Sequence, residues 1–339
     1  MRTVLRIIAA GAGVTLQDGG RFGYLRYGVT PAGPMDPLAF ATANRAAGAP
    51  PDAPAIEVSL GGVELTVDGG PVSLAIAGGG FRLQLDGSEL PMSAVVRLAP
   101  PQKLAIRAGA AGAWCYAAVA GRIDVAPMLG SISTHTRSHF GGIGGRALVA
   151  GDILPIASPR VVEPTIATIV APWLERPGEI IRVLPGPQDD YFTADQMAAF
   201  LQGPWTLSMR SDRMAYLLDG QPLRHAKGFN IISDGVALGA IQVPGNGQPI
   251  VLMADRQPTG GYPKIANVIG ADVGRLAQLR PGVQFRFCRV TIEEAVAARR
   301  TEAHALTEPI VLTPLRRTDL SSEFLLGLNL IDGIVNAEH

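Results

Sequence analysis

The 339-residue sequence predicts a protein made mainly of β-strands with a few short helices, arranged as two related halves in tandem. Three observations favour this fold class. Glycine and proline, with 41 and 27 residues, interrupt the apolar runs at short intervals, which is typical of β-sandwiches and barrels. Helix-capping patterns are few. Two sequence blocks of the first half recur about 150 residues later, roughly the length of one domain.

The strands are indicated by apolar runs of strand length, at residues 55–60, 63–67, 72–77 and 104–107. The two cysteines lie in further runs of this kind, Cys115 in residues 113–120 and Cys288 in residues 283–290. A thiol in such a run usually acts as a small core residue. We therefore expect both thiols to be buried, with catalysis or a disulfide as the lesser alternatives.

The first helix is indicated by Asp36 and Pro37, an N-cap residue followed by proline at the first helical position. The pattern predicts a helix over residues 38–47 that ends at Gly48.

Two more helices begin with capping boxes, Thr193 with Gln196 and Thr291 with Glu294. They predict helices over residues 197–201 and 293–300.

The internal duplication is indicated by residues 33–36, which are echoed by residues 186–189, and by residues 63–69, which resemble residues 214–220. Chance similarity in a glycine-rich chain is the alternative. The proline-rich residues 158–178 form the natural connection. We predict an N-terminal lobe over residues 1–160, a C-terminal lobe over residues 175–300 and a tail over residues 301–339, in which the apolar run 324–330 could dock on a neighbour.

Charge and hydropathy exclude several classes of function. Lysine plus arginine equals aspartate plus glutamate at 29 each, so the chain has no excess of positive charge that would attract nucleic acid or an anionic membrane. With 47% hydrophobic and 17% charged residues, some apolar surface is expected to be covered by a partner protein. No apolar run has the length of a membrane span, and the N-terminus lacks a secretory pattern, so a cytoplasmic location is expected.

The strongest candidate site follows an apolar strand over residues 249–253. Asp255 and Arg256 come directly after this strand, where the scaffold can hold charges at the edge of a cleft. A turn then carries Thr259, Gly260, Gly261, Tyr262 and Lys264, and its glycines permit close approach of a ligand. A charged hairpin turn on the surface is the alternative.

Further candidate residues lie in three other blocks. Asp18 and Arg21, separated by two glycines, could form a fork that binds a carboxylate, or a structural turn. Asn44 belongs to the helix that Asp36 begins, where capping alone would explain the pattern. Arg213 and Gln242 stand beside apolar strands and predict, with the Asp255 block, a cleft for a small amide or carboxylate.

Several motifs are missing from the sequence. It contains no phosphate-binding P-loop, no Gly-x-Ser-x-Gly elbow, no zinc cluster and no biotin-carrying lysine motif. The loop over residues 130–142 contains His135 and His139, but their spacing suits a metal only on a helix, so no metal is predicted. Residues 142–147 match a dinucleotide fingerprint without the strand and helix that it requires.

In combination, these blocks resemble the family formed by the C subunits of 5-oxoprolinase, also called KipA-type or biotin-dependent carboxyltransferase-like proteins. That family is related to the carboxyltransferase region of urea amidolyase. The matching blocks are residues 16–24, 28–36, 43–45, 56–58, 184–189, 211–214, 239–244 and 254–264. They cover roughly the first 290 residues in order.

The resemblance implies two cyclophilin-like β-barrel lobes with a cleft between them. It also implies two partners, the KipI-type B subunit and the A subunit of 5-oxoprolinase, with which the chain would use ATP to open the lactam of 5-oxoproline to L-glutamate. ATP would act at the level of the complex and could bind one of these partners. One alternative is carboxyl transfer to urea or a related amide from biotin on another chain. Another is a non-enzymatic antagonist of a kinase inhibitor.

For the lactam reaction we expect charge to build on the lactam oxygen. Lys264 and the backbone amides near Gly260 and Gly261 could stabilise that charge. Asp255 would orient the nucleophile or the lactam N–H, while Arg256 or Arg21 would bind the carboxylate and Gln242 the amide.

Overall fold

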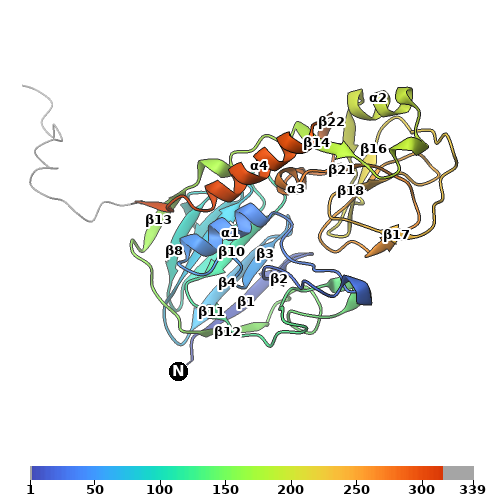
Figure 1. Cartoon of the computed structure of the whole chain (residues 1–339). Coiled ribbons are helices and arrows are strands. Elements are labelled where there is room, and N and C mark those ends of the chain that lie inside the picture. The colour runs from blue at the N-terminus through green and yellow to red at the C-terminus, as the bar shows by residue number, and fades with distance from the viewer. Residues whose placement is uncertain (1, 316–339) are drawn as a thin grey trace, which may run out of the picture.

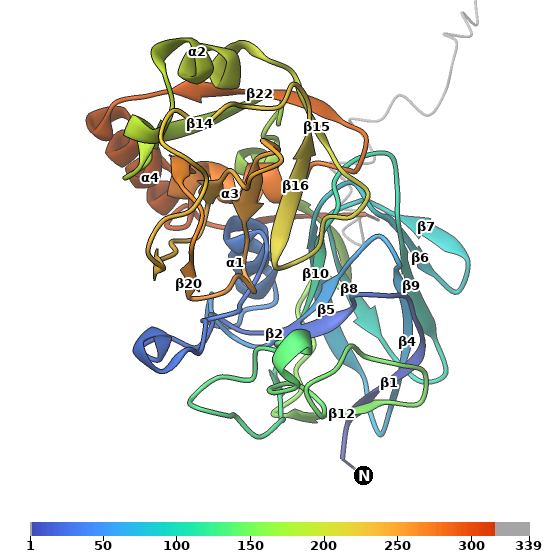
Figure 2. The same cartoon turned by 90° about the vertical axis from the view of Figure 1, so that its right-hand side faces the viewer.

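The computed structural model describes residues 2–315, and within them the predicted mainly-β architecture is confirmed. The first half of the chain forms two seven-stranded sheets, one of which receives its last strand from residues 311–314, and residues 180–289 contain the strands of a closed seven-stranded barrel (Figure 1). Figure 2 shows the barrel stacked on one end of the two sheets.

The first sheet has the strand order β11–β12–β1–β4–β9–β6–β7, and all its neighbours are antiparallel. Its strands are β1 (Val4–Ala10), β4 (Val63–Asp68), β6 (Arg82–Leu85), β7 (Ser88–Leu90), β9 (Lys103–Arg107), β11 (Arg122–Ile123) and β12 (Ile153–Ala157). In β4 the buried residues alternate with half-buried ones, as expected for a strand with one face on a core.

The second sheet has the order β2–β3–β10–β5–β8–β13–β23 and is also antiparallel throughout. Its strands are β2 (Thr15–Gln17), β3 (Ala55–Val58), β5 (Val72–Gly78), β8 (Ala94–Leu98), β10 (Cys115–Val119), β13 (Ile166–Val170) and β23 (Val311–Pro314). β3 and β10 are buried on both faces, because the first sheet covers one face and helix α1 the other.

The barrel closes in the order β14–β21–β18–β19–β16–β15–β22. Its strands are β14 (Ile180–Pro185), β15 (Trp205–Leu207), β16 (Ala215–Asp219), β18 (Ala240–Gln242), β19 (Ile250–Leu252), β21 (Lys264–Val268) and β22 (Gln284–Arg289). Only β14 and β22 are parallel neighbours, and their pairing closes the barrel. A separate two-stranded ladder joins β17 (Asp234–Gly235) to β20 (Thr259–Gly260).

The predicted helices begin where the capping residues indicate. Helix α1 (Pro37–Ala46) starts after Asp36, whose carboxylate accepts a hydrogen bond from the Ala39 amide. Helix α2 (Ala194–Gln202) is capped by Thr193, although Gln196 does not complete the box and accepts a bond from the Arg224 amide instead. Helix α4 (Ile292–Ala305) has both bonds of its capping box.

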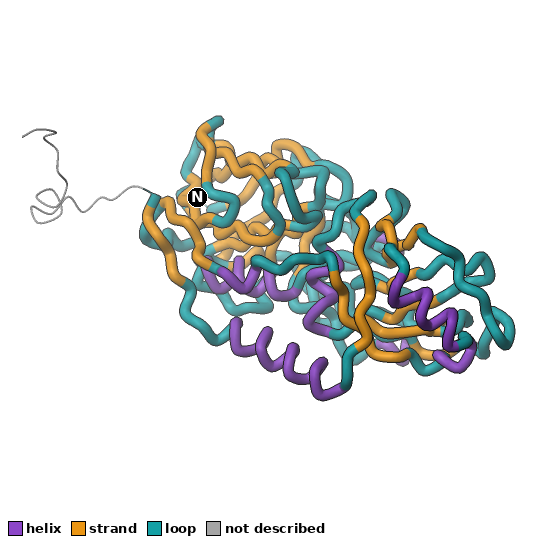
Figure 3. The backbone as a smooth tube through the Cα atoms, turned by 90° about the horizontal axis from the view of Figure 1, so that it is seen from above, coloured by secondary structure: helices purple, strands orange, loops and turns teal. Residues whose placement is uncertain are grey.

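One helix lacks a local signal. Helix α3 (Gly270–Ala277) follows Ile269, which has no capping side chain, and the sequence therefore did not predict it. It packs against α4 and β14. Figure 3 shows that the helices lie mainly along one side of the strands. Short 3-10 turns complete the structure, at η1 (Leu25–Tyr27), η2 (Thr136–Ser138), η3 (Pro172–Leu174) and η4 (Asp189–Tyr191).

The structure differs from three predictions made from the sequence, which concern Cys288, the connection between the halves and the tail. Cys115 is buried as predicted, but Cys288 is exposed, because it lies on the outward face of β22. The presumed connection over residues 158–178 contains β13, which belongs to the second sheet. The tail predicted from residue 301 begins inside α4, and its β23 pairs with β13; residues 316–339, with the apolar run 324–330, lie outside the described residues.

The two halves are joined by buried polar contacts. Gln278, at the end of α3, accepts hydrogen bonds from the amides of Ala113 and Trp114 and donates to the Asp36 carboxylate at 2.9 Å. Arg176 pairs with the same carboxylate at 2.6 Å. These contacts fix the barrel against the second sheet and so define the cleft between them. No helix within residues 2–315 has the length and apolar character needed to cross a membrane.

Candidate active site

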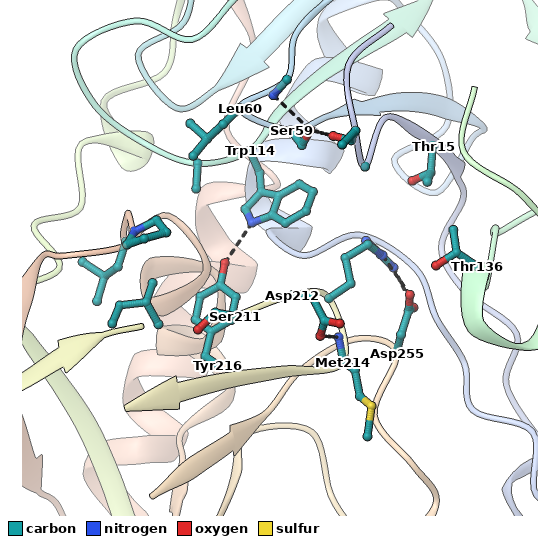
Figure 4. Close-up of a pocket in the computed structure, with 18 of the residues that line it drawn as sticks. Thr15, Ser59, Leu60, Trp114, Thr136, Ser211, Asp212, Met214, Tyr216 and Asp255 are labelled. Carbon is teal, nitrogen blue, oxygen red and sulfur yellow. Dashed lines mark hydrogen bonds and ion pairs between the residues drawn. The ribbon is translucent and has the colours of Figure 1, made fainter. Parts of the chain in front are cut away.

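Two adjoining cavities lie where the halves of the chain meet. The larger has a volume of about 450 Å³ and is drawn in Figure 4, and the smaller has a volume of about 270 Å³. Both are lined by Arg137, Met214 and Asp255, so these three residues form the wall between them. Each cavity receives residues from both halves.

The larger cavity is mainly apolar, with Leu60, Trp114 and Leu279 among its lining residues. The Trp114 indole N–H donates to the Tyr216 hydroxyl at 3.0 Å, a contact between the two halves that Figure 4 shows at one side of the cavity. The Tyr216 hydroxyl donates in turn to the Ala277 carbonyl at 2.8 Å. Both polar atoms of this pair are therefore satisfied, and the aromatic rings act as fixed walls.

The Asp255 carboxylate is held by Arg213. Arg213 donates to both oxygens of Asp255, at 2.8 and 3.0 Å, in the bidentate geometry that suits a guanidinium and a carboxylate. It also donates to the Gly33 carbonyl at 2.7 Å and to Glu57 in the first half. Burial disfavours the charged form, but Asp255 and Glu57 raise the pKa of Arg213 above its ordinary value.

Glu57 is fully buried in β3 and accepts hydrogen bonds from the Met35 amide at 2.8 Å and the Tyr116 hydroxyl at 2.9 Å. Burial raises the pKa of Glu57, while the charge of Arg213 acts in the opposite direction. The Arg213 guanidinium therefore has one acid on each side, and only Asp255 lines the cavities.

Arg256 lines the smaller cavity and differs from Arg213 in having no acidic partner among the described residues. Its only side-chain hydrogen bond there runs from Nε to the Val236 carbonyl at 3.1 Å. Burial lowers the pKa of this guanidinium, and no neighbouring acid offsets the effect. A buried cation without a counter-charge is costly unless an anion pairs with it. Arg256 can therefore bind the carboxylate of a ligand.

His135 lines the same cavity from the first half. Its Nδ1 accepts a hydrogen bond from the Ser138 amide at 3.2 Å, which places the proton of the neutral ring on Nε2. The ring stacks on Phe140, with centroids 5.2 Å apart. His135 thus offers one N–H donor at a fixed orientation.

Asp18, Arg21 and Asn44 line neither cavity. Asp18 accepts bonds from the hydroxyls of Ser131 and Ser133 and from the Ile132 amide. Arg21 is buried and donates to the carbonyls of Met128, Ser131 and Ser133. The two residues hold the loop before His135 rather than forming a fork with each other. Asn44 donates to the carbonyls of Pro51 and Ala53 within its own half.

The remaining predicted residues gather around the β20–β21 turn. Lys264 is buried and pairs with Asp234 at 2.7 Å. Gln242 lies opposite Lys264 on the neighbouring strand, and Gly260 packs against the Gln242 amide. Thr259, Gly261 and Tyr262 lie more openly on the same turn, and Tyr262 is 38% exposed. Lys264, Gln242 and Gly260 are thus brought together, in a cluster separate from the two cavities.

Several site residues were not predicted, namely Glu57, Trp114, His135, Tyr216 and Asp234. Glu57, Trp114, Tyr216 and Asp234 gain their places through partners far away in sequence, and no local pattern marks them. For His135 a signal existed, because its loop combines hydroxyls, imidazoles and an arginine. Within residues 2–315 no group of three or more His, Cys, Asp or Glu residues could hold a metal ion.

Residues 142–147, which match the dinucleotide fingerprint in sequence, do not form a phosphate-binding turn. In place of a strand and a helix, this stretch has an isolated bridge between Ile143 and Arg146. This stretch therefore lacks the glycine-rich turn at the start of a helix that binds phosphates in dinucleotide-binding folds.

The chain is similar to known proteins over most of its length. Residues 27–289 match the model of the family described as carboxyltransferase domain, subdomain A and B. The chain is 41% identical over 308 residues to the C subunit of 5-oxoprolinase from Escherichia coli strain K12, covering 88% of this chain and 95% of that protein. It is 38% identical over 286 residues to the C subunit of 5-oxoprolinase from Haemophilus influenzae, covering 84% and 91% of the two chains.

A solved structure has the same fold over most of the chain. The urea amidolyase of K. lactis superposes with a TM-score of 0.83 at 27% identity, covering 90% of this chain. The chain spans 20% of the length of that enzyme. The likeness therefore concerns one region of a longer protein.

Proposed function

Because the chain belongs to the family of carboxyltransferase domains with subdomains A and B, we propose that it is the C subunit of an ATP-dependent 5-oxoprolinase complex. In this proposal it helps to open the lactam of 5-oxoproline to L-glutamate, together with a KipI-type B subunit and an A subunit. The relatives named as C subunits of 5-oxoprolinase support the role, and their name describes one component of a larger enzyme.

The observation that carries the proposal is the buried Arg256 guanidinium, which lines the smaller cavity without an acidic partner among the described residues. 5-Oxoproline has one carboxylate and one lactam N–H. Arg256 would bind the carboxylate through charge-assisted hydrogen bonds. Asp255, in the same cavity, would accept a hydrogen bond from the lactam N–H, since a carboxylate has lone pairs left after Arg213 is bound.

His135 would complete this arrangement from the first half. Its Nε2–H could donate to the lactam oxygen, on which negative charge grows when the amide is activated. The ring is stacked and hydrogen-bonded, so the donor would be positioned before the substrate arrives. The chain's own contribution is then to bind and orient the lactam, whereas ATP would act elsewhere in the complex.

Apolar side chains near the cleft support a role for partners. Phe22 and Tyr27, in the loop before the Gly28 edge of the smaller cavity, are 71% and 66% exposed. Exposed aromatic side chains of this kind are typical of surfaces that another protein covers.

Carboxyl transfer to urea is the second candidate, and the similarity to urea amidolyase favours it. In that reaction biotin would be carried by another chain. Urea is neutral, however, so the anion beside Arg256 would have to be the carboxyl group being transferred, whereas 5-oxoproline carries its own carboxylate. The charge in the smaller cavity therefore favours an anionic amide over urea.

The test is turnover by the chain co-expressed with its B-type and A-type partners. ATP-dependent glutamate release from 5-oxoproline is expected, without turnover of urea. Arg256→Gln should raise the KM for 5-oxoproline by roughly 10- to 100-fold, the range for a hydrogen bond to a charged group. 2-Pyrrolidinone, the same lactam without the carboxylate, should be used equally poorly by both enzymes.

Arg286→Gln is the matched control, because Arg286 is an exposed arginine on β22 outside both cavities. It should leave the KM unchanged. An unchanged KM in Arg256→Gln would show that the substrate carboxylate does not bind Arg256. Turnover of urea without turnover of 5-oxoproline would overturn the proposed function.

A further inference from the structure

Lys264 is a buried cation that pairs with an exposed aspartate, Asp234. The Lys264 side chain is 4% exposed, whereas that of its partner Asp234 is 55% exposed. Lys264 begins β21, a strand of the closed barrel, and its amide donates to the Gln188 side chain at 3.2 Å. Its backbone is further enclosed by Gly186, where any side chain would collide with the Lys264 carbonyl. The backbone of Lys264 is thus fixed by the barrel, and its ammonium donates to Asp234.

Asp234 is held far less firmly. It lies on β17, a strand of two residues that pairs only with β20. The preceding residues are mostly exposed, and Ile232 is 93% exposed. Segments with few buried contacts and exposed backbone open at low free-energy cost. The carboxylate can therefore move away from Lys264 without disturbing the barrel.

Gln242 adds an unused donor to the same place. Gln242 and Lys264 are opposite residues on β18 and β21, so their side chains project to the same face. The Gln242 Nε2 atom is buried and has no hydrogen-bond partner among the described residues. A buried amide donor without a partner is costly, and its presence indicates that an acceptor is missing.

Gly260 brings these groups together. It is the strand partner of Asp234, and a side chain at Gly260 would collide with the Gln242 Nε2 atom. The missing side chain lets the Gln242 amide lie against the backbone of Gly260, next to the strand that carries Asp234. Gly260 is therefore required by its close contact with Gln242.

We infer that Lys264 and Gln242 form a binding site for a small oxyanion of phosphate type, and that Asp234 occupies this site from within until the ligand displaces it. A compact ammonium and a single amide N–H suit a tetrahedral oxyanion, whereas a planar carboxylate is matched better by a guanidinium fork. The oxyanion could be free phosphate or the phosphate of a larger ligand. The site is independent of the substrate proposed for the Arg256 cavity.

The inference is tested by titrating inorganic phosphate into the full chain at constant ionic strength and measuring the heat of binding by isothermal titration calorimetry. Asp234→Asn removes the internal competitor and should tighten phosphate binding by about 10-fold or more, the effect of a lost competing charge pair. Lys264→Met should abolish binding. Asp190→Asn, which removes an equally exposed aspartate paired with Lys227, should change nothing.

A second readout keeps Lys264 in place. Acetylation of Lys264 by an N-hydroxysuccinimide ester, measured by mass spectrometry, should be faster in Asp234→Asn than in the wild type, and phosphate should suppress it. Unchanged or weaker phosphate binding in Asp234→Asn, or acetylation that phosphate does not affect, would overturn the inference. Neither measurement uses 5-oxoproline turnover, so failure here is distinct from failure of the proposed function.

Discussion

Arg213, in the second half of the chain, forms a buried ion pair with Glu57, in the first half. The same guanidinium holds Asp255 at the wall between the two cavities. The position of the candidate catalytic carboxylate therefore depends on an electrostatic contact between the halves. Stability and activity are linked at this one side chain.

Arg213→Gln should destabilise the protein strongly. The substitution leaves Glu57 and Asp255 without their cation in the interior, and breaking a buried pair costs about 3–5 kcal/mol. Urea denaturation followed by circular dichroism measures the shift of the midpoint. Lys227→Gln breaks an exposed pair and should leave the midpoint almost unchanged. Equal midpoints for the two variants would show that the buried contact contributes little.

Asp255→Asn should reduce kcat of the reconstituted complex by about 100-fold or more, a typical effect for a group that assists proton transfer or orientation. The amide retains the shape of the side chain but loses the charge and one acceptor. KM should change less than kcat, because Arg256 would still bind the carboxylate. Asp190→Asn serves as the control for a lost exposed charge. A wild-type kcat in a folded Asp255→Asn variant would show that Asp255 takes no part in the reaction.

Asp272→Asn should lose stability at neutral pH but not in acid. Burial alone would raise the pKa of Asp272, but hydrogen bonds from Arg182 and the charge of Arg275 outweigh it, so the pKa lies below the ordinary value of 3.8. A lowered folded-state pKa stabilises the protein above the unfolded-state pKa, and this stabilisation is lost as the pH falls through the folded-state pKa. The difference in denaturation midpoint between wild type and Asp272→Asn should therefore be constant above about pH 5 and shrink below pH ~4. A difference that grows in acid would contradict the assigned direction.

Thiol labelling should distinguish the two cysteines. Cys115 is fully buried, and burial raises its pKa to about 12, so it supplies almost no thiolate in the folded protein. Cys288 is exposed. Native protein treated with a thiol reagent should react at Cys288 alone, and Cys288→Ser should abolish labelling until denaturant is added. Labelling of Cys115 at the native rate of Cys288 would contradict its burial.

Local signals in the sequence were sufficient for much of the fold. Asp36 with Pro37 placed the start of α1, and Thr291 with Glu294 placed that of α4, because capping depends on neighbours within one helical turn. Helix α3 has no such cap, and its start depends on packing against α4. For Cys288 the apolar composition of the run concealed which face of β22 points outward.

The candidate site was predicted only in part, since its geometry depends on distant pairs. Asp255, Arg256 and Arg213 were all selected from local composition, and the structure brings Asp255 and Arg256 to one cavity. The glycines beside Arg21 suggested an exposed fork, yet Arg21 donates to carbonyls more than a hundred residues away. No local pattern could reveal that Glu57 shares Arg213, or that Asp234 pairs with Lys264.

The contacts of Gln278 have a consequence for how the chain can vary. One amide side chain uses its oxygen for the amides of Ala113 and Trp114 and its nitrogen for Asp36 and the Trp114 carbonyl. An amide in this position cannot be replaced by a carboxylate, which would lose both donated bonds and bring a negative charge beside Asp36. Gln278 and its partners on the first half, Ala113, Trp114 and Asp36, are therefore constrained together although they lie more than 160 residues apart. A split gene that encodes each half separately would have to recreate this contact before it could recreate the cleft.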